Sequence, residues 1–365
     1  LEESGVDDAC KAAERITSMF ESPIHFDNMQ VRVDISAGIV AFPEHGDTAE
    51  TLMRRADIAM YAAKDLEKMS YSVYEPGRDE EHLRRLRLSN DLRTALRTNA
   101  LTMHYQPKVD LRTNEVCSVE ALVRWIHPEF GFLPPDEFIP LAEKSGHIKE
   151  LTAYVLRTVM RQMRVWKEKG LDLTVAVNLS AHDLLDDTLP STIAALLRDH
   201  GLSAKALILE VTESAVMKDA AYARGVMARL REQGIRLSID DFGTGQASLS
   251  QLKSLPVDEL KIDKSFVRDL TDNEDDKVIV LSIINLAHNM GLEVTAEGVE
   301  TEDSRRLLES FECDVIQGYL ISKPLADSDL TAWLTAQTGQ RDTSNEDTAG
   351  IDALNDGETS ALALG

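Results

Sequence analysis

The sequence predicts an α/β fold in which a (β/α)8, TIM-like barrel follows a smaller α/β unit. Short apolar segments alternate with amphipathic helical segments between residues 101 and 319, which is typical of strands and helices that wind into a barrel. The chain has 365 residues, enough for a barrel of about 250 residues and a second unit. A polar or charged residue ends nearly every apolar segment, as expected where parallel strands meet at an active-site rim.

The bulk composition excludes several classes of function. The formal net charge of −24 argues against binding to duplex nucleic acid or to an anionic membrane surface, since both need a basic face. The three cysteines are widely spaced and form no CxxC pair, which indicates neither a disulfide framework nor a zinc site and suits a reducing cytoplasm. No apolar run reaches the roughly 18 residues of a membrane span, and no signal-peptide pattern is present. We therefore expect a cytoplasmic chain without a membrane segment, although its first residue is Leu1 and a parent protein has room for sensory or membrane segments upstream.

Residues 1–76 predict a small α/β unit. Helical periodicity covers residues 7–20 and 48–66, and strand-like alternation covers residues 31–42 and 71–74. The charged segment that follows, residues 77–99, has leucines near helical spacing and neither proline nor further glycine after Gly77, so it predicts a linker helix.

A resemblance to a known family covers this first unit. Residues 36–75 (SAGIVAFPEHGDTAETLMRRADIAMYAAKDLEKMSYSVYE) resemble the C-terminal half of a GGDEF domain, the diguanylate cyclase fold. The signature loop and nucleotide-binding strands of that family lie upstream of the matching residues, so no cyclase activity is assigned to this chain. Lys64 matches a position that reaches substrate phosphates in the family, but without the missing half we interpret it as a solvated lysine.

The barrel is expected over residues 100–337, followed by an acidic, disordered tail over residues 338–365. The expected strands are residues 101–109, 116–125, 174–179, 206–211, 235–240, 259–262, 293–296 and 315–319. The expected helices are residues 136–142, 151–169, 188–200, 220–233, 278–289 and 303–312.

The polar residues that end these strands are expected to converge on one rim. They are Glu120, Asn178, Glu210, Asp240, Asp241, Lys261, Glu297 and Gln317. The candidate ligands among them offer oxygen atoms, which suit Mg²⁺ or Mn²⁺ better than zinc. So many carboxylates around one point would repel each other unless two divalent cations balance them. Two such cations form an arrangement for in-line attack of water on a phosphodiester, so the sequence predicts a two-metal phosphodiesterase.

A second resemblance covers roughly residues 85–335. The segment Glu120-Ala-Leu-Val-Arg124 resembles the signature of the EAL family of cyclic di-GMP phosphodiesterases, and further motifs follow in the family's order. They include QPK (106–108), residues 127–148, VNLS (177–180), EVTE (210–213), DDFGTG (240–245), residues 255–267, AEGVE (296–300) and QGYLISKP (317–324). The resemblance implies a modified eight-stranded barrel whose first strand is antiparallel, and hydrolysis of the bacterial second messenger cyclic di-GMP to linear pGpG.

The same resemblance implies roles for individual residues. The metal ligands would be Glu120, Asn178, Glu210, Asp240, Asp241 and Glu297. The catalytic set would be Lys261, Glu120, Gln317 and Glu300. Gln317 would position the attacking water or a metal-bound group, and Glu300 would support the site. The dinucleotide would contact Gln106, Leu122, Arg124 and Pro324, and a guanidinium matches phosphate geometry well. Glu213 would anchor the loop after Asp241 and couple metal binding to the interface of a homodimer formed by the barrel domain.

Several alternatives stay open at this point. Lys261 would be a general base if nearby cations and burial lower its pKa. It would stay a cation that stabilises the transition state if a water that bridges two metals ionises without a base. A second alternative is that the chain is a catalytically silent cyclic di-GMP receptor that signals to a partner. Against it, the chain keeps all the metal and lysine positions. An enolase-type lyase also combines rim carboxylates with a lysine, but the paired Asp240 and Asp241 and the Glu120 signature disfavour it. Gln246-Ala247 departs from the family's usual Tyr-Ser in the loop that Glu213 would brace.

Overall fold

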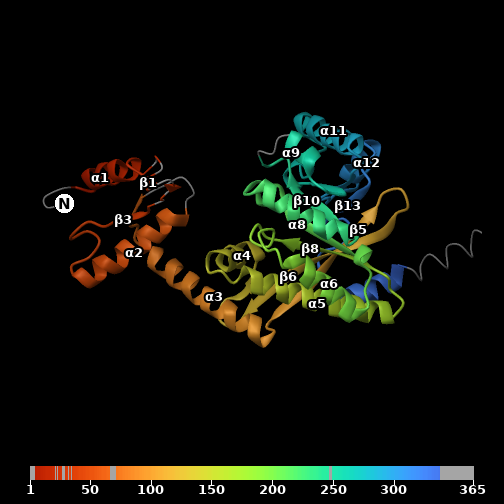
Figure 1. Cartoon of the computed structure of the whole chain (residues 1–365), viewed down its shortest axis with the longest axis horizontal. Coiled ribbons are helices and arrows are strands. Elements are labelled where there is room, and N and C mark those ends of the chain that lie inside the picture. The colour runs from red at the N-terminus through yellow and green to blue at the C-terminus, as the bar shows by residue number, and fades with distance from the viewer. Residues whose placement is uncertain are drawn as a thin grey trace, which may run out of the picture. The chain divides into compact units, whose positions relative to one another are not determined.

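The computed structural model describes residues 5–20, 22, 24–26, 29–31, 33, 35–65, 71–245 and 249–337. The chain divides into two compact units, Leu1–Leu92 and Arg93–Gly365 (Figure 1), here called the N-terminal unit and the barrel. The division falls inside the predicted linker. The predicted tail over residues 338–365 and the departure at Gln246-Ala247 lie outside the described residues, so the predictions made for them stay untested.

Besides most of a third helix, which is treated below, the described residues of the N-terminal unit form two helices and two small sheets. The helices are α1 (Val6–Ser18) and α2 (Ala49–Asp65). The sheets pair β1 (Ile24–Phe26) antiparallel with β2 (Met29–Val31), and β3 (Ala37–Ile39) parallel with β4 (Tyr71–Val73). These bounds confirm the predicted helices and the strand at residues 71–74 to within a few residues.

The prediction of one strand over residues 31–42 is wrong. Val31 ends β2, whereas a separate strand begins at Ala37, and Phe42 already lies in a turn that leads into Pro43. Alternating apolar residues show that a segment is extended, but they do not show where one strand stops and the next begins. The two segments pair with different partners, which only the tertiary structure decides.

The packing of α2 on β3 depends on close backbone contact. A Cβ atom on Gly38 would lie 1.9 Å from the carbonyl oxygen of Ala56 and 2.5 Å from the amide nitrogen of Met60, so only glycine fits there. Ile58, Ala59 and Tyr74 form the buried cluster beneath this contact. The unit therefore has a small core held mainly by one helix and one strand.

A long helix, α3 (Arg78–Thr98), confirms the predicted linker helix. Leu88 and Leu92 are buried on one of its faces, whereas Leu83 and Leu86 are about half exposed. Apolar residues at helical spacing therefore cover one stripe of α3, as the sequence indicates.

Eight strands close into a barrel in the second unit. In ring order they are β5 (Leu101–Asp110), β13 (Val315–Gln317), β12 (Glu293–Ala296), β11 (Glu259–Ile262), β10 (Arg236–Phe242), β9 (Leu207–Thr212), β8 (Thr174–Leu179) and β6 (Glu115–His127). β5 pairs antiparallel with both β6 and β13, and the other neighbouring pairs in the ring are parallel. The predicted modified barrel with an antiparallel first strand is confirmed.

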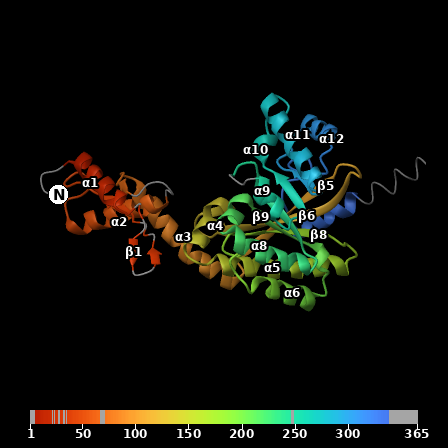
Figure 2. The ribbon, with the colours of Figure 1, turned by 45° about the horizontal axis from the view of Figure 1, so that its top comes forward.

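Helices cover the outside of this sheet, as the views in Figures 1 and 2 show. The six predicted helices are α4 (Pro135–Lys144), α5 (Ile148–Glu168), α6 (Leu189–His200), α8 (Ala220–Glu232), α11 (Glu274–Asn289) and α12 (Glu302–Ser310). Short elements that the sequence reading missed are β7 (Gly131–Leu133), η1 (Ala204–Ala206), α7 (Glu213–Met217), α9 (Leu249–Ser254), α10 (Lys264–Val267) and β14 (Leu325–Ala326). Elements this short carry too little periodicity to be recognised. Within the described part of the chain, no helix has the length and apolar character needed to cross a membrane.

Candidate active site

The predicted rim residues come together at the carboxyl ends of the parallel strands. Strand pairing sets their levels, since Asn178 on β8 lies opposite Glu210 on β9, and Lys261 on β11 lies opposite Thr295 on β12. Glu297 follows the last residue of β12 directly. Because alternate strand residues point into the barrel, side chains at the same or the next inward level on its strands come together at this end.

The ammonium group of Lys261 lies at the centre of this cluster. Its Nζ is 2.5 Å from Oε1 of Glu297 and 3.9 Å from Oε2 of Glu120. It is also 3.0 Å from Oε2 of Glu210 and 3.0 Å from Oδ1 of Asp240. The side chain is completely buried, so one cation is surrounded by four carboxylates in a nearly dry environment.

Two amides complete the cluster around Glu120. Asn178 donates its Nδ2 to Oε1 of Glu120 at 2.7 Å, and Gln317 donates its Nε2 to Oε2 at 2.6 Å. The same Nε2 of Gln317 lies 3.2 Å from Oε1 of Gln106. Both oxygens of Glu120 are therefore held in place by side chains of two other strands, β8 and β13.

Asp240, Asp241 and Glu297 form the group that can hold a metal ion in the described part of the chain. One ligand atom from each lies within 4.8 Å of the others. Asp241 has a φ of 54°, a left-handed conformation that is uncommon outside glycine, and its amide donates to Oδ1 of Asp240 at 2.9 Å. The turn at the end of β10 thus directs two consecutive carboxylates to one side, as the sequence suggested.

Burial and charge shift the pKa values of these groups in opposite directions. Burial alone would lower the pKa of Lys261, but Asp240, Glu120, Glu210 and Glu297 raise it well above its usual range. Burial would raise the pKa of Glu210, yet two ammonium groups, Lys108 and Lys261, lower it to about 2. Lys261 and Glu210 are therefore an ionised pair in this structure.

The pKa values of three other carboxylates in the cluster are raised. Burial raises the pKa of Glu120 and raises that of Glu297 to about 8, in both cases against the opposing effect of Lys261. Burial, and after it the charge of Asp240, raises the pKa of Asp241 to about 6. The carboxylates of this cluster, including Glu210 and Glu259, outnumber its two lysines, Lys108 and Lys261, and an excess of negative charge is the property expected of a site for cations.

A second buried ion pair lies inside the barrel next to the cluster. Lys108 on β5 is fully buried, with its Nζ 2.5 Å from Oε1 of Glu210 and 3.5 Å from Oε1 of Glu259. The sequence reading included Lys108 only as part of a matching motif and did not single out Glu259. A signal was present, because each is a charged residue inside an otherwise apolar strand.

Glu213 lies against the loop that follows β10. It is buried, and its Oε2 accepts a hydrogen bond from the amide of Gly243 at 3.3 Å. A Cβ atom on Gly245 would lie 2.4 Å from Oε1 of Glu213, so the loop passes directly over this carboxylate. The structure brings Glu213 to the loop that it was predicted to anchor, and the coupling to a dimer stays a prediction.

The residues predicted to contact the dinucleotide surround the same rim. Gln106 donates to the carbonyl oxygen of Ser322 at 3.1 Å, and the carbonyl oxygen of Pro324 lies 3.3 Å from Nδ1 of His104. Arg124 is half-buried, and burial lowers the pKa of its guanidinium against the opposing effect of Glu120.

Glu300 is the predicted site residue that is not brought to the cluster. Its side chain is exposed, and within the described part of the chain it makes no hydrogen bond or ion pair. It precedes Thr301, the N-cap residue of α12. Its predicted supporting role therefore has no contact behind it in this structure.

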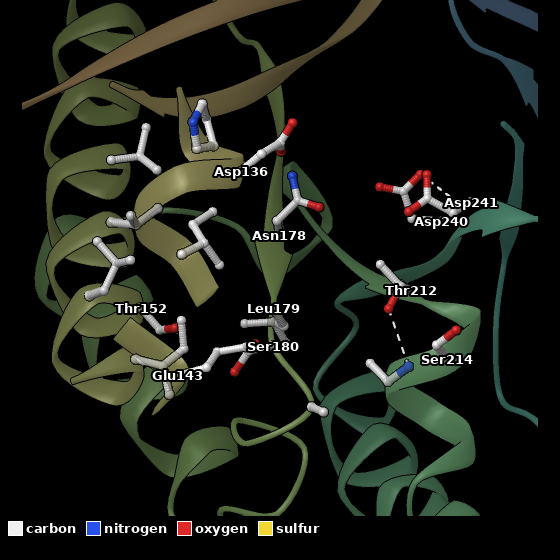
Figure 3. Close-up of a pocket in the computed structure, with 18 of the residues that line it drawn as sticks. Asp136, Glu143, Thr152, Asn178, Leu179, Ser180, Thr212, Ser214, Asp240 and Asp241 are labelled. Carbon is white, nitrogen blue, oxygen red and sulfur yellow. Dashed lines mark hydrogen bonds between the residues drawn. The ribbon is translucent and has the colours of Figure 1, made fainter. Parts of the chain in front are cut away.

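A cavity of about 480 Å³ opens beside the cluster. Figure 3 shows Asn178 on one side of it and Asp240 and Asp241 on the opposite side. Leu122, predicted to contact the dinucleotide, lines it as well, and much of its wall is apolar. Carboxylates at one end of a largely apolar cavity are the arrangement expected for a ligand that has both charged and aromatic parts.

Comparison with known families finds two matches. A family model described as "EAL domain" matches residues 89–324, and one described as "Diguanylate cyclase, GGDEF domain" matches residues 1–70. The first covers more than half of the chain and includes every predicted site residue.

Two curated relatives show similarity over most of the chain. The bifunctional diguanylate cyclase/cyclic di-GMP phosphodiesterase MucR of Pseudomonas aeruginosa is 40% identical over 326 residues, which cover 89% of this chain and 48% of MucR. The cyclic di-GMP phosphodiesterase PdeR of Escherichia coli is 37% identical over 313 residues, which cover 86% of this chain and 47% of PdeR. The chain thus spans about half the length of the curated relatives it matches.

Solved structures agree with the barrel. The PaMucR phosphodiesterase in complex with c-di-GMP is 43% identical, with a TM-score of 0.64, and the match covers 67% of this chain and 99% of that one. The EAL domain of Mycobacterium smegmatis DcpA is 37% identical, with a TM-score of 0.56, and covers 65% of this chain and 97% of that one.

Proposed function

The chain belongs to the EAL-domain family, with part of a GGDEF domain ahead of its barrel, and from this premise we propose that it is a metal-dependent phosphodiesterase that hydrolyses cyclic di-GMP to linear pGpG. The observation that carries the proposal is the convergence of the rim carboxylates and amides around Lys261 at the strand ends. Two similar proteins, MucR and PdeR, are named as phosphodiesterases of this dinucleotide. The lyase alternative has no support from either observation.

The rim suits divalent cations by its chemistry. Its donor atoms are carboxylate and amide oxygens, which hard cations prefer. The buried Oε1 of Gln317 has no hydrogen-bond partner within the described residues and is left to bind a water or an ion. The residues that would hold two Mg²⁺ or Mn²⁺ ions are Glu120, Asn178, Glu210, Asp240, Asp241 and Glu297. When bound, the two cations would polarise the phosphate and make a water molecule easier to deprotonate.

Lys261 is assigned the role of a positively charged donor rather than a general base. Its Nζ lies within 3.0 Å of three carboxylates, Glu210, Asp240 and Glu297, and it donates a hydrogen bond to Glu210. The same group would donate to a phosphate oxygen as negative charge builds up there during the attack of water. Gln317 holds Glu120 through Nε2, and its Oε1, which has no hydrogen-bond partner among the described residues, would orient the water.

The dinucleotide is proposed to lie across the rim and into the cavity lined by Leu122. Arg124 would pair with a phosphate through its planar guanidinium. Gln106 would use its amide, which already faces Gln317 and Ser322, and Pro324 would supply a backbone contact. Glu213 would keep the loop after Asp241 in the position that lets Asp241 reach a cation.

The test is conversion of cyclic di-GMP to pGpG by the purified chain with Mg²⁺ or Mn²⁺, followed by chromatography. Wild type should turn over, whereas Glu120→Ala should not, because both amides that organise the rim lose their acceptor. Tight binding of cyclic di-GMP without turnover by the wild type would instead identify a receptor. If the wild type neither binds nor hydrolyses cyclic di-GMP, the family's activity is rejected for this chain.

A homodimer formed by the barrel is part of the same proposal. Three apolar side chains of α11 are exposed, Val278 (64%), Ile279 (38%) and Leu281 (39%), and such a patch is typical of an interface. Light scattering after size-exclusion chromatography tests this, and Val278→Glu should shift a dimer to the 40.5 kDa monomer. A wild type that is monomeric at high concentration would contradict it. We also propose a cytoplasmic location, which the free thiols of the chain support, since thiols stay reduced there.

A further inference from the structure

Inside the barrel, beside the proposed metal site, lies a pair of charged residues that the proposed reaction does not use. Lys108 on β5 and Glu259 on β11 are buried, with 0% and 2% of their surfaces exposed. Neither is among the residues proposed to bind a cation, the dinucleotide or the attacking water. Burying an ion pair usually gives no more stability than apolar residues of the same size would, so stability alone does not account for it.

The contacts of Lys108 point to Glu210. Nζ of Lys108 lies 2.5 Å from Oε1 of Glu210, whereas Nζ of Lys261 lies 3.0 Å from the other oxygen, Oε2. The carboxylate is therefore held from two sides by two different donors. Oε2 is the oxygen on the rim side, since Lys261 also contacts Asp240 and Glu297 there.

Lys108 is itself fixed from behind. Its second partner, Oε1 of Glu259, lies 3.5 Å from Nζ and accepts a hydrogen bond from Oγ1 of Thr295 at 2.6 Å. Lys108 and Glu259 together add no net charge to the barrel. Lys108 therefore gives Glu210 a fixed contact as well as a positive charge, and Glu259 balances that charge within the barrel.

We propose that Lys108 is a positioning residue, which holds Oε1 of Glu210 so that Oε2 faces the rim and is ready to bind a divalent cation. The inference rests on the proposed function, because it presumes that Glu210 is a metal ligand. Groups that orient a metal ligand from behind commonly contribute about 10- to 100-fold to metal affinity.

The experiment measures Mn²⁺ affinity directly, by electron paramagnetic resonance of the free ion, and needs neither substrate nor turnover. The main variant is Lys108→Met/Glu259→Gln, which removes the ammonium and keeps the barrel interior electrically balanced. Lys108→Gln/Glu259→Gln is made beside it, because a shorter polar side chain preserves polarity but does not reach Glu210. Glu259→Gln alone is the matched control, since it keeps the contact between Lys108 and Glu210. Thermal unfolding identifies the folded variants, which are the ones compared.

We expect both double variants to bind Mn²⁺ about 10- to 100-fold more weakly than wild type, and Glu259→Gln to stay close to wild type. Equal affinity of a folded double variant and wild type would overturn the positioning role. A loss in Glu259→Gln as large as in the double variants would also overturn it, since the effect would then belong to Glu259. A wild type that binds no Mn²⁺ would defeat the proposed metal-dependent function itself, and the positioning role with it.

Discussion

The two units of the chain bury their polar groups in different ways. The barrel closes its sheet on itself, so each of its eight strands pairs on both sides. Its interior can therefore hold full charges, such as Lys108 and Lys261, because a carboxylate from another strand of the ring, Glu210 on β9, reaches both ammonium groups. In the described part of the N-terminal unit the sheets have two strands each, and Phe42 and Met53 are largely exposed. A closed sheet supports a charged site, whereas the small open sheets support only a small apolar core.

The largest expected difference between the units concerns catalysis by their lysines. Lys261→Met should lower kcat for cyclic di-GMP by about 10³-fold, because it removes the donor at the centre of four carboxylates. Lys64→Met, at an exposed lysine of α2, should leave kcat unchanged. The measurement is steady-state pGpG formation. Activity retained in Lys261→Arg but not in Lys261→Met would support a cationic role over a general base.

The same contrast explains how far the sequence alone could lead. The barrel strands at residues 174–179, 259–262 and 293–296 were predicted with their observed bounds, because short apolar runs between polar turns leave little choice. In the N-terminal unit, by contrast, residues 31–42 were read as one strand although two strands share them. Strand alternation shows local extension, and pairing decides where an extended segment is divided.

For the site, the ends of the predicted strands were sufficient to find the rim residues, but they did not indicate the buried pair Lys108 and Glu259 beside them. Glu120, Glu210 and Lys261 were predicted together because carboxyl ends of parallel strands meet. The contact of Lys108 with Glu210 depends on β5 running antiparallel, so that a residue near its carboxyl end reaches the same carboxylate. Motif position likewise suggested a role for Glu300, whose exposed side chain has no contact to support it among the described residues. Sequence order does not report depth inside a barrel.

A substitution at Gly38 should damage the N-terminal unit and spare the barrel. An alanine Cβ would overlap the backbone of Ala56 and Met60, which cannot move without displacing α2. Gly38→Ala should cost about 3 kcal/mol or more in the local stability of this unit. Hydrogen exchange of residues 49–65 measures the loss, and pGpG formation should be unchanged. Gly225→Ala on α8, where a Cβ meets nothing within 4 Å, is the control and should exchange like wild type. Loss of activity in Gly38→Ala would show that the barrel depends on the N-terminal unit.

Removal of the metal ions should lower the stability of the barrel and leave the stability of the N-terminal unit unchanged, the reverse of what is expected for Gly38→Ala. The carboxylates of Asp240, Asp241 and Glu297 lie together and repel each other unless cations balance them. Saturating Mg²⁺ or Mn²⁺ at about 100 times its dissociation constant should stabilise the barrel by about 2.7 kcal/mol, and chelation should reverse this. Scanning calorimetry would show the shift in one transition. An equal shift in the transition assigned to the N-terminal unit, using Gly38→Ala as its marker, would contradict a site confined to the barrel.

The smallest expected difference compares one kind of hydrogen bond in the two environments. Thr295 donates to Oε1 of Glu259 at 2.6 Å inside the barrel, and Tyr74 donates to Oδ2 of Asp79 at 2.9 Å in the N-terminal unit. Glu259 is almost fully buried, whereas a quarter of the Asp79 side chain is exposed and water can replace a lost donor. Thr295→Val should therefore cost about 2 kcal/mol and Tyr74→Phe about 1 kcal/mol or less. Calorimetry on each variant provides the comparison. Equal losses would mean that the closed barrel holds its charges in a wetter interior than its burial indicates, and the positioning role proposed for Lys108 would then lose its physical basis.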